Sequence, residues 1–378
     1  MTRLPHDHID PDGLEEFSVV FTDRSLNHMS ARFQQVMRDI SDGLREVYGA
    51  AAVAVVPGGG TYAMEAVARQ FGHGAKVLVV RNGWFSYRWS QIFEAGNFAA
   101  DTVIAMARST GNAAQSAFAP PPIEEVTARI RAERPQAVFA PHVETSSGII
   151  LPDDYVTALA EAAHEVGALM VLDCIASGCI WVDMAKTGVD VLISAPQKGW
   201  SASPSAGLVM FSKAAEARLE ATSSDSFALD LKKWRAMMAA YEGGGHAYHA
   251  TMPTDTLLGF RDAMAETRAM GFEAAREAQW ELGRAVRAML AARGVKSVAA
   301  EGYGAPGVVV SYTDDPAVQN GARFREEGLQ IAAGVPLQVG EGEGFQTFRL
   351  GLFGLDKIGD VPGTLARLEA AVNKVFPA

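Results

Sequence analysis

A short apolar run leads directly into a lysine in the stretch Val189-Asp190-Val191-Leu192-Ile193-Ser194-Ala195-Pro196-Gln197-Lys198-Gly199-Trp200-Ser201. The run is typical of a strand that is covered on both faces. Lys198 follows it among small residues, so its amine either lies in a solvated loop or is held at a buried strand end for chemistry. In a desolvated pocket a lysine amine can bond covalently to an aldehyde. Other motifs of the chain decide between these interpretations.

Similar apolar runs recur before this stretch and alternate with amphipathic segments. They cover residues 51–56, 77–80, 102–105, 137–140, 168–172, 189–193 and 207–211. Helical spacing of apolar residues is found at about 30–48, 62–71, 123–133 and 153–166. This alternation predicts an α/β fold with a mostly parallel sheet covered by helices on both faces. In such a fold, ligands bind at the carboxyl ends of the strands.

The pattern changes from about Asp255 onward. A long helical stretch from Thr256 to Arg293 precedes strands at 308–312 and 345–350 and a last helix at 361–375. This order predicts a smaller C-terminal α+β domain. We therefore expect an N-terminal segment at 1–29, a large domain at 30–255 and a small domain at 256–378.

Composition excludes several classes of protein. The 378 residues are 48% hydrophobic and carry a net charge of −11, with no basic block, so nucleic acid and anionic membranes are poor partners. The chain has no run of about 20 apolar residues to span a membrane and no signal-like start, so we expect a cytoplasmic protein. Cys174 and Cys179 have neither zinc-site nor redox spacing, which predicts two free buried thiols and no metal site.

A glycine-rich motif, Pro57-Gly58-Gly59-Gly60-Thr61, follows the first predicted strand and opens a helix. Glycines let the backbone approach a phosphate, and the helix N-terminus offers free N–H groups to it. Thr61 can cap the helix or donate its hydroxyl. The alternative is an ordinary tight turn. A nucleotide P-loop is disfavoured because no lysine follows the glycines.

Two further motifs follow the second and fourth predicted strands. The first, Asn82-Gly83-Trp84-Phe85-Ser86-Tyr87-Arg88, places aromatic rings where they either stack on a flat ligand or belong to the core. The second is His142-Val143-Glu144-Thr145-Ser146-Ser147-Gly148. Its hydroxyl groups either bind a polar ligand or cap the next helix.

Two charged residues occupy apolar surroundings. Asp173 ends the run 168–172, where a buried carboxylate is costly unless it is paired. Its partner is either structural or a protonated pyridine nitrogen, which would make the ring an electron sink. Arg349 lies in an apolar strand, where its planar guanidinium suits a substrate carboxylate or an internal ion pair. Asp173 precedes Lys198 by 25 residues, which is room for one connection and one strand, so the two are expected on neighbouring strand ends.

Taken in order, these motifs resemble the class V aminotransferases of pyridoxal-phosphate (PLP) fold type I. The order is Gly-Gly-Gly-Thr, Asn-Gly-aromatic, His-x-Glu-Thr-Ser-Ser-Gly, Asp-x-Ile-Ala-Ser, Gln-Lys-Gly and Arg-Leu-Gly. The resemblance covers roughly residues 30–375. Alanine–glyoxylate, serine–glyoxylate and 2-aminoethylphosphonate–pyruvate transaminases are the most similar members. The resemblance implies a large and a small domain, as in that fold.

The resemblance also implies a role for each motif residue. Lys198 would hold PLP as the internal aldimine, Asp173 would pair with the ring nitrogen, and Ile175 would pack under the ring. Phe85, with Trp84 second, would stack on the ring, and Thr145 would hydrogen-bond near its hydroxyl. The phosphate would be held by Gly59, Gly60, Thr61 and Gln197.

Other implied roles concern the substrate and a second subunit. Arg349 would bind the substrate carboxylate, and Tyr248 and Thr251 would reach the phosphate of the partner in a homodimer with shared sites. The family usually opens with a Gly-Pro-Gly-like segment at the substrate pocket. This chain instead has Phe21-Thr22-Asp23-Arg24-Ser25-Leu26-Asn27-His28. Asp23, Arg24 or Asn27 are therefore candidates for reshaping the pocket.

The implied activity is ping-pong transamination. A small amino donor (alanine, serine or an aminoethylphosphonate-like compound) would pass its amino group to glyoxylate or pyruvate. A PLP-dependent lyase acting on a small amino acid would use the same Lys198 and Asp173. A desulfurase is disfavoured because the chain has no cysteine after Cys179. A non-catalytic module that binds a phosphate ligand leaves Lys198, Asp173 and Arg349 unexplained.

Overall fold

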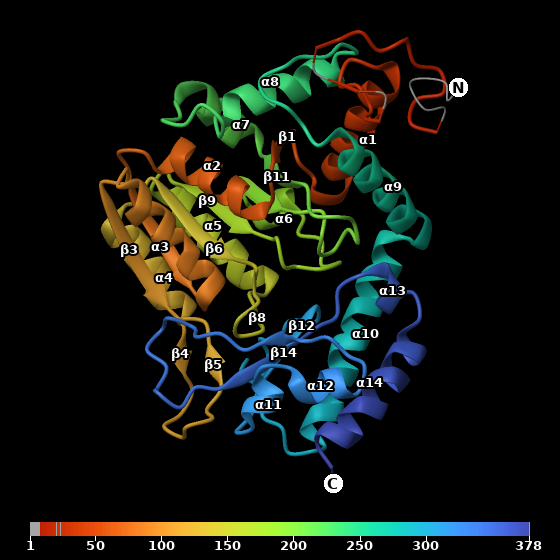
Figure 1. Ribbon diagram of the computed structural model, residues 1–378. Coiled ribbons are helices and arrows are strands. Elements are labelled where there is room, and N and C mark those ends of the chain that lie inside the picture. The colour runs from red at the N-terminus through yellow and green to blue at the C-terminus, as the bar shows by residue number, and fades with distance from the viewer. Residues whose placement is uncertain (1–7, 20, 23, 378) are drawn as a thin grey trace.

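The computed structural model describes residues 8–19, 21–22 and 24–377, which form a large and a small domain joined along one side by two long helices (Figure 1). The strands of the large-domain sheet are β1 (Ala52–Pro57), β2 (Lys76–Arg81), β3 (Asp101–Met106), β6 (Ala137–Pro141), β9 (Leu169–Asp173), β10 (Val191–Ser194) and β11 (Ala206–Phe211). Their order is β1-β11-β10-β9-β6-β2-β3. Only β11 runs antiparallel to its neighbours, so the predicted α/β fold with a mostly parallel sheet is confirmed.

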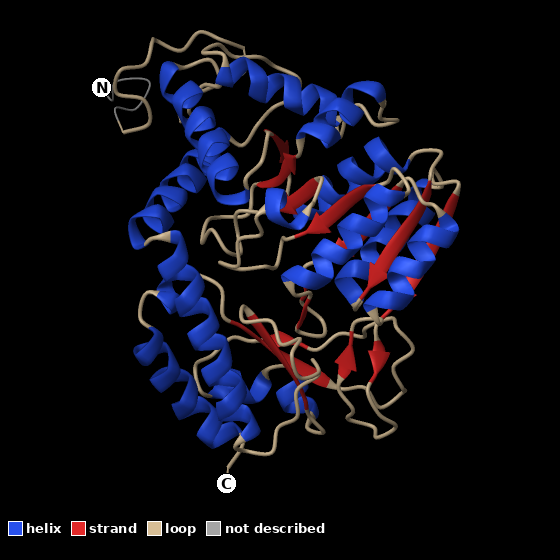
Figure 2. Cartoon of the chain, turned by 180° about the vertical axis from the view of Figure 1, so that it is seen from behind, coloured by secondary structure: helices blue, strands red, loops and turns tan. Residues whose placement is uncertain are grey.

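Helices pack against this sheet (Figure 2). They are α1 (Ala31–Tyr48), α2 (Gly60–Gly72), α3 (Trp84–Gly96), α4 (Ile123–Glu133), α5 (Asp153–Glu165), α6 (Met184–Thr187), α7 (Lys213–Ala221) and α8 (Leu231–Glu242). The predictions for α1, α2, α4 and α5 are confirmed to within two residues at each end. The aromatic motif after β2 opens α3, a helix that apolar spacing did not reveal. Its N-cap, Gly83, has no side chain to cap it, and the distant Glu144 accepts a hydrogen bond from the Ser86 N–H instead.

Two short hairpins lie where the large domain meets the small domain. They pair β4 (Arg108–Ser109) with β5 (Phe118–Ala119) and β7 (Val143–Glu144) with β8 (Ile149–Ile150). The turn between β7 and β8 holds the hydroxyl-rich motif, and Gly148 adopts a left-handed conformation there with φ +70°. The next helix, α5, has Pro152 as its N-cap and no side-chain cap hydrogen bond, so the alternative that this motif caps it is wrong.

The small domain is built on the sheet β12-β14-β13. Its elements are α10 (Phe272–Ala291), β12 (Val308–Tyr312), α11 (Pro316–Gln319), α12 (Ala322–Glu326), β13 (Ala332–Ala333), β14 (Thr347–Gly351), α13 (Leu355–Ile358) and α14 (Val361–Val375). The helical stretch predicted from 256 to 293 consists of two helices. Gly271, with φ +92°, divides it into α9 (Thr254–Met270) and α10.

The two long helices belong to different cores. Leu257, Phe260 and Met264 of α9 are buried in the large-domain core, whereas α10 contributes to the core of the small domain. The core therefore changes at Gly271, while the predicted boundary at 255/256 falls inside α9. The described part of the N-terminal segment, up to Ser30, contains neither helix nor strand, and its Leu26 N–H donates to Asp255 at 2.9 Å.

Burial tests the expectation for the two cysteines. Cys174 and Cys179 are both buried and free, as predicted. Over the described residues, none of the helices combines the length and apolar character needed to cross a bilayer.

Candidate active site

A cavity of about 250 Å³ surrounds Lys198 at the carboxyl ends of the parallel strands. It brings together residues from both domains: Gly60, Thr61, Met64, Phe85, Arg88, Val143, Thr145, Asp173, Ile175, Ala176, Gln197, Lys198 and Arg349. Nine of these carry roles implied by the family resemblance. Met64, Arg88, Val143 and Ala176 were not singled out from the sequence.

Asp173 and the strand that leads to Lys198 lie side by side. Asp173 is the last residue of β9 and faces Ile193 of the parallel neighbour β10, and Lys198 follows four residues after β10 ends. Burial raises the pKa of Asp173 to about 7, although the Ile175 N–H donates to its Oδ1 at 2.9 Å. A buried carboxyl with a single described donor is suited to a cationic partner from a ligand.

Lys198 is an amine held partly out of water. Its Nζ lies 5.2 Å from the centroid of the Phe353 ring. Burial lowers its pKa, and the nearby cation Arg349 lowers it further. A larger neutral fraction makes the amine a better nucleophile and base. The interpretation of Lys198 as a solvated loop lysine is therefore wrong.

The glycine motif forms the start of α2. The helix begins at Gly60, and its N-cap, Gly59, supplies no side-chain hydrogen bond, so the first N–H groups are available to an anion. Thr61 lies inside the first turn rather than at the cap, and its Oγ1 accepts a hydrogen bond of 2.9 Å from Arg88 Nη1. Beside this loop, Gln197 Oε1 is buried without a described hydrogen-bond partner.

Arg349 enters the cavity from β14 of the small domain. Its Nε donates to the Ala333 carbonyl at 2.8 Å, and its guanidinium lies 5.6 Å from the Phe85 ring centroid. Among the described residues, no carboxylate forms an ion pair with it, so the alternative of an internal ion pair is wrong. Its guanidinium edge is therefore available to an anionic substrate group.

Glu144 holds the wall of the site that carries Phe85, and the sequence did not single it out. Its fully buried carboxylate accepts hydrogen bonds from the N–H groups of Phe85 at 3.1 Å and Ser86 at 2.8 Å. It also accepts from the Ser86 hydroxyl at 2.6 Å and the Ser146 hydroxyl at 2.7 Å. The carboxylate thus caps α3 and fixes the Phe85 backbone. An acidic residue within a buried, hydroxyl-rich motif was the available signal.

Four predicted positions, Tyr248, Thr251, Arg24 and Asn27, lie away from this cavity. The Tyr248 hydroxyl is 3.2 Å from Thr251 Oγ1, and the Tyr248 ring packs at 5.5 Å from His28, with 55% of Tyr248 exposed. Arg24 and Asn27 do not line the cavity either, and Asp23 lies outside the described residues. Within one chain, these segments form a separate patch beside α8.

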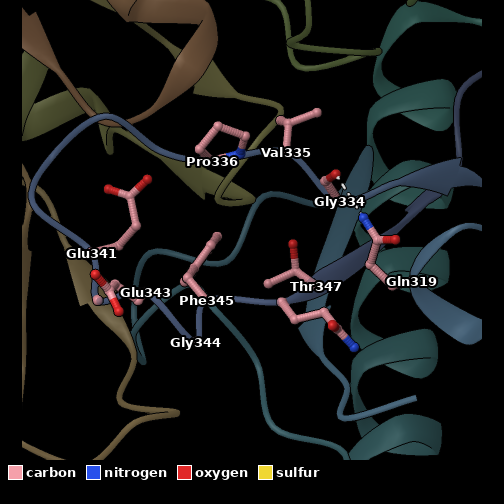
Figure 3. A pocket seen from close by; sticks show the side chains of 11 residues that line it. Gln319, Gly334, Val335, Pro336, Glu341, Glu343, Gly344, Phe345 and Thr347 are labelled. Atoms are coloured by element: carbon pink, nitrogen blue, oxygen red, sulfur yellow. Dashed lines mark hydrogen bonds between the residues drawn. The ribbon is translucent and has the colours of Figure 1, made fainter. Parts of the chain in front are cut away.

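A second cavity, of about 470 Å³, lies beside β14 in the small domain. Glu341 and Glu343 lie at one end of it and Gln319 at the other (Figure 3). The Glu341 carboxylate already accepts hydrogen bonds from the backbone N–H groups of residues 337–339. In the described chain no lysine, arginine or histidine lines this cavity. It is therefore unsuited to a phosphate, unlike the cavity at Lys198.

The residues around Lys198 fit PLP on structural grounds. Asp173 offers a buried carboxylate to a ring nitrogen, the open start of α2 offers N–H groups to a phosphate, and Lys198 offers an amine to an aldehyde. A β-carbon at Gly60 would lie 2.4 Å from Ile175 Cδ1 and would displace that side chain. The fold and this site define a PLP-dependent enzyme of fold type I.

The comparisons with known proteins agree with this class of enzyme. The family model for aminotransferase class-V matches residues 15–311. The chain belongs to the class V aminotransferase family and is a PLP-dependent aminotransferase.

Individual relatives are distant. The chain is 29% identical to a 2-aminoethylphosphonate–pyruvate transaminase of Salmonella paratyphi B over 84% of this chain and 83% of that one. It is 25% identical to a Synechococcus protein described as the small subunit of a soluble hydrogenase, over 93% and 88% of the two chains. The crystal structure of an alanine–glyoxylate aminotransferase from Nostoc sp. superposes with a TM-score of 0.77 at 24% identity, covering 92% of this chain and 88% of that one. The last similarity supports the fold alone.

Proposed function

We propose that this aminotransferase moves an amino group from a small amino donor such as alanine, serine or aminoethylphosphonate to glyoxylate or pyruvate. The observation that carries the proposal is the convergence of Asp173, Lys198 and Arg349 on one small cavity. The cavity of about 250 Å³ has to hold the cofactor together with the substrate, which is compatible with small substrates. The similarity to an aminoethylphosphonate–pyruvate transaminase supports the same class of substrates.

The chain's own residues perform the positioning and proton transfer. When bound, PLP supplies an electron sink for the negative charge that develops at the donor α-carbon. Asp173 holds the ring nitrogen in its protonated form, and Arg349 orients the donor through its anionic group. The Lys198 amine, neutral in larger fraction because its pKa is lowered, removes the α-proton as a general base. Phe85, fixed through Glu144, supplies the flat wall against which the ring packs.

The roles of the remaining cofactor residues are part of the same proposal. Gly59, Gly60, Thr61 and Gln197 bind the phosphate, Ile175 packs on the ring face, and Thr145 hydrogen-bonds near the ring hydroxyl. Their supporting observation is position, because all except Gly59 line the cavity, and Gly59 caps the helix that opens into it.

We also propose a homodimer in which Tyr248 and Thr251 complete the phosphate site of the partner subunit. Their supporting observation is exposure, because both residues are exposed within one chain and the described chain leaves several large apolar side chains uncovered. The uncovered residues include Leu14, Phe17, Val19, Phe227 and Tyr248. Such a surface is typical of a protein interface. Mixing the Lys198→Ala and Tyr248→Ala chains tests the shared sites, because mixed dimers would regain one intact site and part of the activity.

The experiment that tests the activity follows the amino group. The purified enzyme is incubated with ¹⁵N-alanine and glyoxylate, and ¹⁵N is expected in glycine in the wild type and not in Lys198→Ala. A second donor panel contains serine and aminoethylphosphonate with pyruvate as acceptor. Label released as ammonia without amino acceptor product would instead support the lyase alternative.

A further inference from the structure

Two arginine side chains enter the same cavity from different domains. Arg88 comes from the second turn of α3 and Arg349 from β14. Neither forms an ion pair with an acidic side chain within the described chain. An arginine that is partly buried without a carboxylate partner is suited to a ligand anion. The proposed function assigns a ligand only to Arg349.

The hydrogen bond of Arg88 connects it to the phosphate loop. Its Nη1 donates to Thr61 Oγ1 at 2.9 Å, and its guanidinium lies 5.3 Å from the Phe85 ring centroid. Thr61 is the second residue of α2, at the end of the helix whose N–H groups are open to an anion. Because Oγ1 accepts from Arg88, the hydroxyl hydrogen of Thr61 remains available to donate to a phosphate oxygen.

The electrostatic effects of the two arginines fall on different groups. Burial dominates at Asp173 and raises its pKa to about 7, and Arg88 acts in the opposite direction there. Burial lowers the pKa of Lys198, and Arg349 lowers it further. Arg88 therefore contacts Thr61 and acts on the charge of Asp173, whereas Arg349 acts on the charge of the Lys198 amine.

We propose that Arg88 is a charged member of the cofactor-phosphate site and does not bind substrate. It orients the Thr61 hydroxyl and adds a full positive charge to the partial charge of the α2 N-terminus, opposite a phosphate of charge about −1.5 to −2. Of the two arginines that line the cavity in the described chain, Arg349 is then the one left for the substrate. The inference rests on the proposed function and limits the amino donors of the enzyme to compounds with one anionic group. Aspartate and glutamate carry two carboxylates and are therefore excluded as donors.

Four variants separate the two roles: Arg88→Gln, Arg88→Lys, Thr61→Val and Arg349→Gln. The dissociation constant for PLP is measured by absorbance titration of the cofactor-free protein, and the bound phosphate is observed by ³¹P NMR as a function of pH. The concentrations of alanine and of aspartate that give half-saturation are then measured on cofactor-saturated enzyme.

Arg88→Gln is expected to weaken PLP binding by about 10- to 100-fold. It should shift the ³¹P resonance. The alanine concentration at half-saturation should stay within about twofold of the wild-type value, since in this proposal Arg88 touches no substrate. Arg88→Lys should recover part of the PLP affinity, because charge returns without the planar fork. Combining Arg88→Gln with Thr61→Val should cost less than the sum of the single changes, since both remove one interaction. Arg349→Gln should show the converse pattern: PLP affinity retained, alanine affinity lost.

The proposal is overturned if Arg88→Gln retains PLP affinity and the ³¹P signal while half-saturation by alanine rises. It is equally overturned if the wild type accepts aspartate as readily as alanine and Arg88→Gln abolishes only the aspartate reaction. Both results would leave transamination itself intact. A wild-type protein that binds PLP but transfers no amino group would overturn the proposed function, while the PLP and ³¹P measurements would still test the role of Arg88.

Discussion

Gly60 and Ile175 are packed so closely that a β-carbon on the glycine would lie 2.4 Å from Ile175 Cδ1. The contact joins the start of α2, where we propose that the phosphate binds, to Ile175, two residues after β9, which we propose packs on the ring. In the proposed site, the close approach of these two walls depends on the missing methyl group at Gly60. No helical or strand propensity requires glycine at this position.

Gly60→Ala is expected to push the Ile175 side chain into the cavity and to weaken PLP binding by at least about tenfold, since overpacking costs about 1–3 kcal/mol. Gly59→Ala is the matched comparison. Its β-carbon would meet nothing within 4 Å, and its φ of 165° is ordinary extended backbone. Absorbance titrations with PLP should therefore show a far smaller loss for Gly59→Ala. Equal losses would contradict the steric explanation.

Asp173 predicts a pH-dependent stability of the cofactor-free protein. Burial raises its folded pKa to about 7, so between about pH 4 and pH 7 the folded state holds a proton that the unfolded state releases. Stability therefore falls as pH rises through this window, by at most about 4 kcal/mol at about 1.4 kcal/mol per pKa unit. Asp173→Asn should remove the dependence, and Tm measured from about pH 5 to about pH 8 checks it.

PLP should reverse this trend in the wild type, because a cationic ring nitrogen favours the ionised carboxylate. Asp173→Asn should still bind PLP, but its transamination rate should fall by at least about 100-fold, because the neutral amide no longer holds a charged ring nitrogen. A variant with wild-type turnover would show that Asp173 has no such role.

Arg349 predicts a shift in the titration of Lys198. Because this cation lowers the pKa of the amine, Arg349→Met should raise that pKa. The rate at which the cofactor-free protein takes up PLP, plotted against pH, should then have its inflection at higher pH. Arg88→Met is the matched control, since Arg88 acts on Asp173 instead. An inflection that moves equally in both variants would argue against separate positions for the two charges.

Gly271 predicts a stability effect far from the site. Its φ of +92° separates α9 from α10, and a side chain there should cost about 1–3 kcal/mol of unfolding free energy. Gly259→Ala, inside α9 with nothing within 4 Å of the added β-carbon, should instead stabilise by about 0.5–1 kcal/mol. Urea denaturation distinguishes the two. Destabilisation by both variants would contradict the conformational argument.

Local pattern was enough to predict much of this molecule. Continuous apolar runs predicted the sheet strands because strands buried on both faces need no polar alternation. The order of motifs identified the family, and Lys198, Asp173 and Arg349 stood out because charged residues in apolar runs require partners. By contrast, apolar spacing ran across Gly271 without a break, since spacing does not report a single residue's φ.

The sequence by itself determined the strands, the chemistry of each strand end and the family. Tertiary structure alone decided that Glu144 caps α3, that Arg88 meets Thr61 and that Arg349 faces the same cavity as Lys198. These residues are separated from their partners by 27 to 151 positions in the chain. The physical reason is that periodicity and capping act over a few residues, whereas a binding site is made by contacts between segments whose sequences carry no mark of one another.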